Sequence, residues 1–583
     1  MIQVLSTNIT SPLGFTTEQN YRAVCSGVSA LRRYDGLWGL PEPFAASLFS
    51  EEQIAKLALD GYTRFESLAI HSVREALSHT QMDVTSPKVV LILSTTKGNI
   101  GGSPSEAAGR IGAAIGLTTT PIVVCNACVS GLSAQLLADH LLSAGFYDYA
   151  IVVGAEVQSK FIVSGFQSLK AVSDEPCRPF DIERNGLNPG EAAATIVFEK
   201  APGGWFLANG ATCNDAYHIS SPSPQANGLT AAIETVMEGQ DKSQLACICV
   251  HGTATLYNDQ MESKAIQRAG LSDVPLSALK GYYGHTMGAA GVLETILTMC
   301  ATDDGIVLPS KGFTELGVSG NVCISNEPLE TDKTAFLKIM SGFGGCNVAA
   351  LYAKTPSDSP SMRRTKGSLP LKGEVWKGSS IRLSSKEGKS LTDIYKQQIG
   401  NYPKFHKMDI LSRLAFVAAE QTLSNSPSMG RNKVSLALEG EVWRGSIILF
   451  NHSSSIVADR QYLSTISDAD NFFPSPSVFV YTLPNIAAGE IAIRHHCMGE
   501  TSFYILPEKD EALMQQILEA SIAASGATSV ISGWIDAESE TTFECEMSYY
   551  EMKSEELRVK AAIKREESDA CISYPEPSKQ REP

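Results

Sequence analysis

The first 354 residues alternate between short, wholly apolar runs and longer segments whose apolar positions recur every three or four residues. Apolar runs such as residues 89–93 and 151–153 are typical of strands that are buried on both faces of a sheet. Residues 64–77 show the helical period instead, which predicts an amphipathic helix. The alternation predicts an α/β fold in which helices cover a largely parallel sheet.

The expected elements follow this rhythm through the first part of the chain. Strands are expected at residues 2–5, 88–95, 121–124, 149–155, 195–198, 246–250, 334–341 and 349–354. Helices are expected at residues 17–26, 64–77, 106–115, 131–144, 230–237, 259–269 and 289–300.

The composition changes after residue 354. Residues 355–373 are rich in Pro, Ser, Lys and Arg and lack periodicity, which indicates a linker. With 583 residues the chain is too long for one ordinary core, so at least two domains are expected. We predict one domain over residues 1–354, with halves of about 1–200 and 201–354, a second over 374–560, and a disordered tail at 561–583.

Charge and hydropathy exclude several kinds of partner. The net charge of −16 and the isoelectric point near 5.2 argue against nucleic acid and anionic membranes. The first residues show no basic segment followed by an apolar core, so no signal peptide is expected. No apolar run approaches the roughly 18 residues of a membrane span. We therefore expect a cytoplasmic protein.

The 13 cysteines follow no regular spacing, which argues against a disulfide framework. The single CxxC motif, Cys125 to Cys128, has no second ligand pair at matching spacing, and His495, His496 and Cys497 are adjacent rather than helically spaced. No metal site is therefore expected, although the CxxC spacing alone leaves a dithiol redox role open. No glycine-rich nucleotide motif occurs, so no cofactor is expected.

Cys128 lies where a buried strand gives way to a helix, on the expected tight turn between residues 124 and 131. Backbone N–H groups at a helix start are unpaired and the helix dipole favours negative charge. A thiolate at this position would be stabilised, although a single cysteine on such a turn is more often a buried packing residue.

Two histidines further along the chain favour this chemistry. His251 follows a buried strand and precedes Gly252, and His285 follows Gly284 and precedes a helix of small residues. Either histidine alone could be an ordinary turn residue. Together with Cys128 they suffice for acylation of a thiol and polarisation of a carbonyl group.

These residues belong to an ordered series of motifs. The region of about residues 1–354 resembles the β-ketoacyl-[acyl carrier protein] synthases of the thiolase superfamily, in the class with one cysteine and two histidines. The matching segments are Asn126-Ala127-Cys128-Val129-Ser130-Gly131, Arg178-Pro179-Phe180-Asp181 with Gly190-Glu191, His251-Gly252-Thr253-Ala254-Thr255 with Asn258-Asp259 and Glu262, Lys280 with Gly284-His285, Gly288-Ala289-Ala290-Gly291 with Glu294, and Gly342-Phe343-Gly344-Gly345-Cys346-Asn347.

The resemblance implies a five-layered α-β-α-β-α fold built from two related halves, and a decarboxylative condensation. Cys128 would take an acyl group from acyl carrier protein, and malonyl carrier protein would then lose CO₂ and attack the acyl thioester. His251 and His285 would stabilise the enolate, and the backbone N–H groups of Cys128 and Phe343 would hold the oxyanion. This chemistry serves fatty acid, polyketide or aryl-polyene biosynthesis.

The same resemblance assigns supporting roles. Lys280, Glu294, Asp259 and Glu262 would order the site, and Phe343 would gate the substrate pocket. The second gate position is Ser341, where many relatives carry an aromatic residue. Residues 98–120, which help form the dimer interface in the family, are shorter than their usual counterpart. Cys125 and Cys346 lie near the site in sequence and are predicted to be packing residues.

The second half of the chain is a partial repeat of the first. Residues 402–405 with the helix 411–423 parallel 62–65 with the helix up to 77, and residues 445–451 parallel the strand at 88. Residues 490–494 and 501–506 parallel 109–116 and 121–126, and residues 525–526 and 530–533 parallel 144–145 and 152–154. At this offset of about 380 residues Glu508 stands opposite Cys128, and neither histidine motif recurs.

Residues 481–490 resemble a ketosynthase segment that lies at the dimer interface and against the pocket floor. The second half as a whole resembles the small ketosynthase-like N-terminal domains found beside aryl-polyene and pigment synthases. It is interpreted as a degenerate, non-catalytic companion, comparable to a chain-length factor, that shapes the acyl tunnel. The alternative is a decayed duplication with a structural role only.

The leading hypothesis is therefore a 3-oxoacyl-[acyl carrier protein] synthase, an acyltransferase. Its expected partners are acyl carrier protein and acyl and malonyl thioesters, together with a second copy of itself or a chain-length-factor-like subunit. Two alternatives stay open: an acyltransferase of the same fold that does not decarboxylate, and a companion or scaffold subunit for another synthase.

Overall fold

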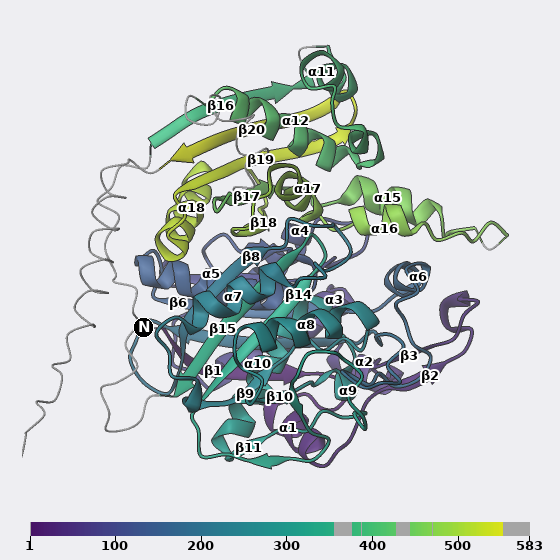
Figure 1. Cartoon of the computed structure of the whole chain (residues 1–583), viewed down its shortest axis with the longest axis vertical. Coiled ribbons are helices and arrows are strands. Elements are labelled where there is room, and N and C mark those ends of the chain that lie inside the picture. Colours follow the sequence, from purple (N-terminus) through teal and green to yellow (C-terminus); the bar gives the residue numbers. More distant parts are fainter. Residues whose placement is uncertain (1, 355–375, 386–387, 427–442, 469, 552–583) are drawn as a thin grey trace, which may run out of the picture.

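The structure is a computed structural model that describes residues 2–354, 376–385, 388–426, 443–468 and 470–551. The predicted linker and tail lie outside these residues. Within them, 16 strands form one continuous sheet, with helices on both of its faces (Figure 1). No helix of this part of the chain has the length and apolar character needed to cross a membrane.

The N-terminal half of the first domain contributes five neighbouring strands to this sheet. Their order is β1 (Gln3–Thr10), β7 (Ala192–Glu199), β6 (Tyr149–Glu156), β4 (Val89–Ser94) and β5 (Ile122–Val124). Strands β4, β5 and β6 are parallel, whereas β7 runs antiparallel to both of its neighbours. The other half contributes β8 (Trp205–Asn214), β15 (Cys346–Lys354), β14 (Ala335–Gly342), β9 (Leu245–Cys249), β10 (Pro275–Ser277) and β12 (Cys323–Ile324).

The two halves stack in layers because central strands such as β4, β6 and β7 are buried on both faces. Helix α3 (Arg64–Ser78) covers the outer face of the first half, where Leu91 and Ile151 point. Helices α5 (Ser130–Ala144) and α10 (Ala290–Asp303) fill the space between the halves. Helices α7 (Asn227–Met237) and α8 (Leu256–Arg268) cover the outer face of the second half. These layers are the five that the family resemblance implied.

Shorter elements complete the first domain. They are α1 (Thr17–Cys25), β2 (Arg32–Tyr34), β3 (Phe44–Ala46), α2 (Glu51–Leu57), α4 (Pro104–Ala114), α6 (Lys160–Ser168), α9 (Lys280–Tyr283), β11 (Ile306–Val307) and β13 (Leu329–Glu330).

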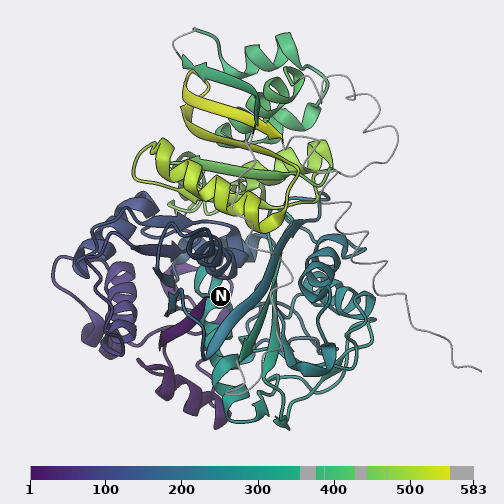
Figure 2. The same ribbon diagram turned by 90° about the vertical axis from the view of Figure 1, so that its left-hand side faces the viewer.

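Residues 376–551 build a smaller α/β unit above the first domain (Figures 1 and 2). Its strands are β16 (Trp376–Ser384), β17 (Ser446–Asn451), β18 (Thr501–Ile505), β19 (Ser529–Ser539) and β20 (Thr542–Glu551). Its helices are α11 (Leu391–Gln398), α12 (Ile410–Ser424), α15 (Ile456–Ser464), α16 (Pro476–Tyr481), α17 (Ile486–His495) and α18 (Glu511–Ser525). We call residues 376–551 the companion unit.

The companion unit joins the first domain strand to strand. Strand β18 pairs antiparallel with β5, with Tyr504 opposite Val124 and Ile505 opposite Val123, and helix α18 packs beside α5. The strand order across this junction is β4, β5, β18, β17. Strand β18 thus has the same place in the companion unit that β5 has in the first domain. The two halves of the chain therefore meet through equivalent strands, as two subunits related by a twofold axis would. Tyr504 and its partner Val124 are about 380 residues apart, which is also the offset of the sequence repeat.

Two expectations about the sheet are wrong. The sheet is mixed rather than largely parallel, because β7, β8, β15, β16 and β20 pair antiparallel with their neighbours. Strand β8 and helix α6 were not expected. Strand β8 is only part-buried over most of its length and contains Gly210 together with polar residues, so it lacks the continuous apolar run of strands such as β4 and β6.

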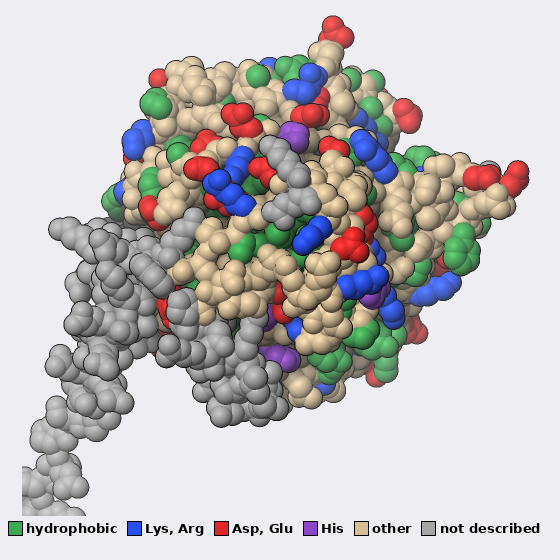
Figure 3. Space-filling view, turned by 90° about the horizontal axis from the view of Figure 1, so that it is seen from above, with side chains coloured by type: hydrophobic (Ala, Val, Ile, Leu, Met, Phe, Trp, Pro, Cys, Tyr) green, Lys and Arg blue, Asp and Glu red, His purple; other side chains and the backbone are tan. Residues whose placement is uncertain are grey.

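The surface of the companion unit carries both signs of charge. Seen from above, acidic and basic side chains are intermixed over this face (Figure 3). Such mixing avoids the single-sign field that a surface for nucleic acid would present.

Candidate active site

Cys128 lies in a single 3₁₀ turn, Ala127–Val129, between β5 and α5. Ala127 has a φ of 49°, in the left-handed region that a residue with a side chain rarely adopts. This sharp turn at the end of the strand points the cysteine into a cavity of about 100 Å³ that His251 and His285 also line.

His251 lies two residues beyond the end of β9, and its backbone is held from two sides. The Glu262 carboxylate accepts hydrogen bonds from the N–H groups of His251 and Gly252, each at 2.7 Å. The Lys280 ammonium donates to the His251 carbonyl oxygen at 2.5 Å. The imidazole ring therefore extends from a fixed backbone.

His285 follows α9, and a backbone contact selects its tautomer. The N–H of Met287 donates to Nδ1 of His285 over 3.2 Å, so the proton of the neutral ring lies on Nε2. Nε2 of His285 and Nδ1 of His251 are buried and find no hydrogen-bond partner among the described residues. Buried polar atoms of this kind are expected to meet a ligand.

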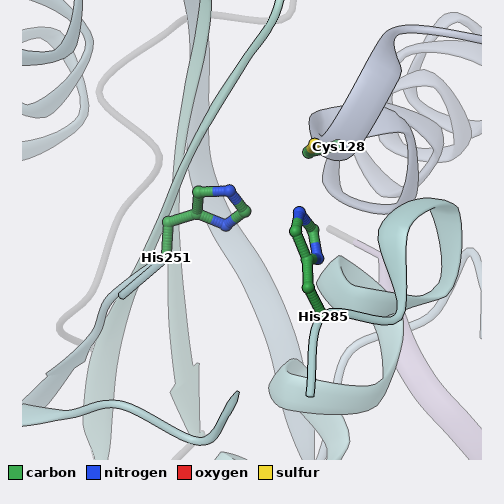
Figure 4. Close-up of side chains that lie close together, drawn as sticks. All are labelled: Cys128, His251 and His285. Carbon is green, nitrogen blue, oxygen red and sulfur yellow. The ribbon is translucent and has the colours of Figure 1, made fainter. Parts of the chain in front are cut away.

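The three side chains come together from separate elements (Figure 4). One ligand atom from each of Cys128, His251 and His285 lies within 4.8 Å of the others, and the two ring centroids are 4.9 Å apart. Among the described residues these three also form the one group of Cys, His, Asp and Glu side chains close enough to hold a metal ion. His495, His496 and Cys497 form no such group.

Burial keeps both imidazoles neutral. It lowers the pKa of His251 and of His285 well below the ordinary value, and the charge of Lys280 lowers both further. At neutral pH each ring can thus donate one hydrogen bond without carrying charge.

The thiol differs from the sequence-based expectation. Although Cys128 faces the cavity, the protein around it removes the thiol from bulk water and raises its pKa to about 12, against the smaller opposing effects of Lys280 and its own N–H. The prediction of a stabilised thiolate is therefore not borne out, because burial of the thiol disfavours its charged form. A neighbouring neutral imidazole can accept the proton as the thiol attacks.

The predicted supporting residues surround the histidines. Each carboxylate oxygen of Glu294 is 2.7 Å from an ammonium group, one from Lys280 and one from Lys338. Asp259 accepts a hydrogen bond from the Phe180 N–H at 2.8 Å. Burial raises the pKa of Asp259 to about 6, and burial with the nearby Asp259 raises that of Glu262 to about 7.

The loop after β14 brings Phe343 to the cysteine. A Cβ atom on Gly342 would lie 3.4 Å from the Cys128 nitrogen, which places the backbone just before Phe343 beside that of Cys128. Ser341 lines the same cavity, where its hydroxyl donates to Asn347 at 2.7 Å. The second gate position therefore carries a small polar side chain.

Several residues that line the site were not found from the sequence. Behind Cys128 a smaller cavity of about 20 Å³ is closed by residues of both halves: Thr96, Lys97, Ala127, Ile162, Phe166, Met287 and Phe343 from the first domain, and Phe479, Thr482 and Leu483 from the companion unit. Two of these residues, Thr482 and Leu483, could have been indicated by the resemblance of residues 481–490 to a pocket-floor segment. Phe479 and Phe166 carry no sequence signal of their own.

Cys125 and Cys346 lie in the packed interior. Cys125 is fully buried and its thiol is 3.5 Å from the Thr96 carbonyl oxygen. Cys346 is buried against Thr501 and Asn485. All cysteines in the described ranges are free thiols, so Cys125 and Cys128 are unpaired in this structure.

Comparison with family models identifies the first domain. Residues 74–202 match the model "Beta-ketoacyl synthase, N-terminal domain", and residues 205–314 match "Beta-ketoacyl synthase, C-terminal domain". Both domains of the β-ketoacyl synthases are therefore matched, in order, within residues 74–314 of this chain.

Curated relatives are similar over the same region. The chain is 26% identical to 3-oxoacyl-[acyl-carrier-protein] synthase 2 of Staphylococcus aureus (strain COL) over an alignment of 403 residues. This alignment covers 59% of this chain and 96% of the relative. It is 31% identical to the synthase 2 of Vibrio cholerae over 273 residues, covering 42% of this chain and 65% of that one.

Solved structures extend the similarity in fold to both halves. The structure described as "PfaC Keto synthase-Chain length factor" covers 94% of this chain and 78% of its own, with a TM-score of 0.73 and 13% identity. The ketosynthase ApeO of Xenorhabdus doucetiae, solved in complex with its chain length factor ApeC, covers 61% of this chain and 98% of its own, with a TM-score of 0.52 and 22% identity. The layers of this chain are thus similar in fold to those of solved ketosynthases.

Proposed function

We propose that the protein catalyses the decarboxylative condensation of an acyl thioester with malonyl-[acyl carrier protein] to give 3-oxoacyl-[acyl carrier protein]. The convergence of Cys128, His251 and His285 in one cavity carries this proposal. The relatives named 3-oxoacyl-[acyl-carrier-protein] synthase 2 support the reaction and the carrier protein as partner.

The first half-reaction is acyl transfer to Cys128. The thiol loses its proton to a neighbouring neutral imidazole as its sulfur attacks the thioester carbonyl carbon, and the carrier thiol leaves with a proton. The N–H groups of Cys128 and Phe343 are the proposed donors to the oxyanion of the tetrahedral intermediate.

The second half-reaction is decarboxylation and attack. His285, with its proton on Nε2, and His251 donate to the carbonyl oxygen of the malonyl thioester. Loss of CO₂ leaves an enolate whose charge lies on that oxygen, and the two donors stabilise it most as the charge develops. The enolate carbon then attacks the acyl group on Cys128.

The test follows both half-reactions. Purified protein is incubated with acyl and malonyl carrier proteins, acylation is measured by intact mass, and CO₂ release is measured with labelled malonyl. We expect an acyl adduct that is absent in Cys128→Ala, and a loss of roughly 10²–10³-fold in CO₂ release in His285→Ala. Condensation by Cys128→Ala at the wild-type rate would contradict the proposal.

The same assay separates the alternatives. An acyltransferase that does not decarboxylate would load Cys128 and release no CO₂. A scaffold for another synthase would do neither unless its partner were added. The paired histidines with their unpartnered nitrogens favour the decarboxylating enzyme.

We also infer that the companion unit acts as a chain-length-factor-like partner within the same chain. It occupies the free edge of β5, where a second copy would otherwise pair. Its α17 start lies against the catalytic loop: the Asn485 side chain donates to the Phe343 carbonyl oxygen at 2.8 Å. One chain would thus supply the active site and its partner, with no second copy needed at this edge.

The contribution of the companion unit to the acyl pocket is testable through Phe479. Its buried ring packs on Phe161, Phe166 and Tyr462, with ring centroids 5.3–6.3 Å apart, and closes the cavity behind Cys128. Gly165 leaves the space that this ring fills.

We expect Phe479→Ala to lengthen the acyl groups found on Cys128 and in the product, because it removes the ring that limits the cavity. Chain length is measured by mass spectrometry of the trapped acyl-enzyme. Phe473→Ala is the control, since that side chain is 79% exposed and lies in the same unit. An unchanged chain length in Phe479→Ala would favour a purely structural role.

We propose the cytoplasm as the place of action. The free thiols of the described cysteines suit a reducing compartment.

A further inference from the structure

The β14 strand contains a buried lysine that the proposed reaction does not account for. Lys338 is fully buried, and lysine is among the residues least often found in that state. Its ammonium group lies 2.7 Å from Glu294, 3.2 Å from the Val250 carbonyl oxygen and 3.3 Å from that of Cys249. It therefore holds the last turn of backbone before His251.

Lys338 acts together with Lys280. Lys280 donates to the carbonyl oxygen of His251, so three consecutive carbonyls at the end of β9 accept from two ammonium groups. Glu294 gives one carboxylate oxygen to each lysine. One carboxylate thus faces two cations, and this buried triad carries a net charge of +1.

The excess charge lies beside both catalytic rings. After burial and Lys280, the charge of Lys338 is a further cause that lowers the pKa of His251 and of His285. The Lys338 ammonium itself stays charged, because the Glu294 carboxylate, through its charge and its hydrogen bond, raises the Lys338 pKa against the effect of burial. Several ionisable groups face the triad from neighbouring elements: Cys249 on β9, Asp259 and Glu262 on α8, and Cys128, Cys177, His251 and His285.

We propose that Lys338 is a positioning residue for the condensation, which fixes the strand end that carries His251 and, together with burial and Lys280, opposes protonation of both imidazoles. A protonated ring would bind the malonyl carboxylate and oppose its loss as CO₂. It would also be unable to accept the Cys128 proton, and in His285 it would break the bond from Met287. The inference rests on the proposed decarboxylating function.

The test compares two variants that differ in charge. Lys338→Gln keeps N–H donors for the strand carbonyls and removes the charge, whereas Lys338→Arg keeps the charge. CO₂ release from malonyl carrier protein is measured from pH 5 to 9. We expect the acid limb of the Lys338→Gln profile to lie at higher pH than that of the wild type, because loss of the charge raises the pKa of both rings. Lys338→Arg should keep the wild-type limb even if its rate is lower throughout.

A Lys338→Gln profile that superimposes on the wild-type profile after scaling would overturn the proposal and leave Lys338 a structural role. A second readout is independent of activity: the titration of the His251 ring followed by NMR of ¹³C-histidine-labelled full-length protein, assigned with His251→Gln. We expect the His251 pKa to rise in Lys338→Gln, and an unchanged titration would also overturn it. If the wild type releases no CO₂ at any pH, the proposed function fails, and the NMR titration still decides whether Lys338 controls the rings.

Discussion

At the scale of single residues, the site combines a hard-to-ionise thiol with two neutral imidazoles. All three states have the same cause, which is burial: it disfavours the thiolate of Cys128 and the imidazolium forms of His251 and His285 alike. The reacting atoms of the site are therefore uncharged before the reaction begins. Charge appears there only as the reaction proceeds, where fixed donors can stabilise it.

This state of Cys128 predicts its reactivity. With a pKa of about 12, the thiolate fraction should increase about tenfold for each pH unit between pH 7 and 10. Alkylation of the Cys128 peptide by iodoacetamide, followed by peptide mass spectrometry, should rise accordingly. A rate that already reaches its plateau near pH 7 would instead restore the thiolate stabilised by the helix start.

At the scale of elements, two helices set the distance between the nucleophile and His285. Helices α5 and α10 meet backbone to backbone where Gly131 and Gly291 cross: a Cβ atom on Gly131 would come within 2.8 Å of the Gly288 carbonyl oxygen, and one on Gly291 within 2.5 Å of the Leu132 nitrogen. These glycines are needed for close approach, because neither backbone can move aside as a flexible side chain would.

We therefore expect Gly291→Ala to lower the free energy of unfolding by about 1–3 kcal/mol. It should also reduce condensation, because it separates α5, which follows Cys128, from α10, which follows His285. Denaturant unfolding and the CO₂ assay measure the two effects. Gly109→Ala is the matched control: Gly109 lies in the interior of α4 with nothing within 4 Å of its Cβ position. There the same change should stabilise by about 0.5–1 kcal/mol. Equal effects of the two substitutions would argue against the packing explanation.

At the scale of the whole molecule, a buried ion pair joins the two halves beside the acyl cavity. The Lys97 ammonium lies 2.7 Å from Asp459 and also donates to the Thr482 carbonyl oxygen and to Ser455. The side chains of Lys97 and Asp459 are 4% and 11% exposed. A partner removed at such a site leaves an uncompensated charge in the protein interior.

Asp459→Asn should therefore lower the free energy of unfolding by about 3–5 kcal/mol, measured by denaturant unfolding of the full chain. The double variant Lys97→Met with Asp459→Leu should recover most of this loss, because it buries no charge. A double variant that is as unstable as the single one would show that the contact between the halves depends on other interactions.

Local pattern was sufficient for much of this protein. The apolar runs placed β4, β5 and β6 and the helices α3, α5 and α10, because strands and helices leave different periods in the sequence. The motif series placed Cys128, His251, His285, Lys280 and Glu294, which the folded chain brings together. Even the companion unit was visible as a repeat, since β17, β18 and β19 keep the apolar runs of β4, β5 and β6.

Three properties depend on the folded chain, because each arises from segments far apart in sequence. The pairing of β18 with β5 joins residues 504 and 124, and no local pattern specifies which edges meet. Burial, which reverses the expected ionisation of Cys128, depends on everything packed around the thiol. The role proposed for Lys338 requires the contact of β14 with Glu294 on α10. The role proposed for Phe479 requires the companion unit to line the cavity next to Cys128. Residue type and spacing are thus enough for the chemistry, whereas partner, charge state and pocket length are decided by tertiary contact.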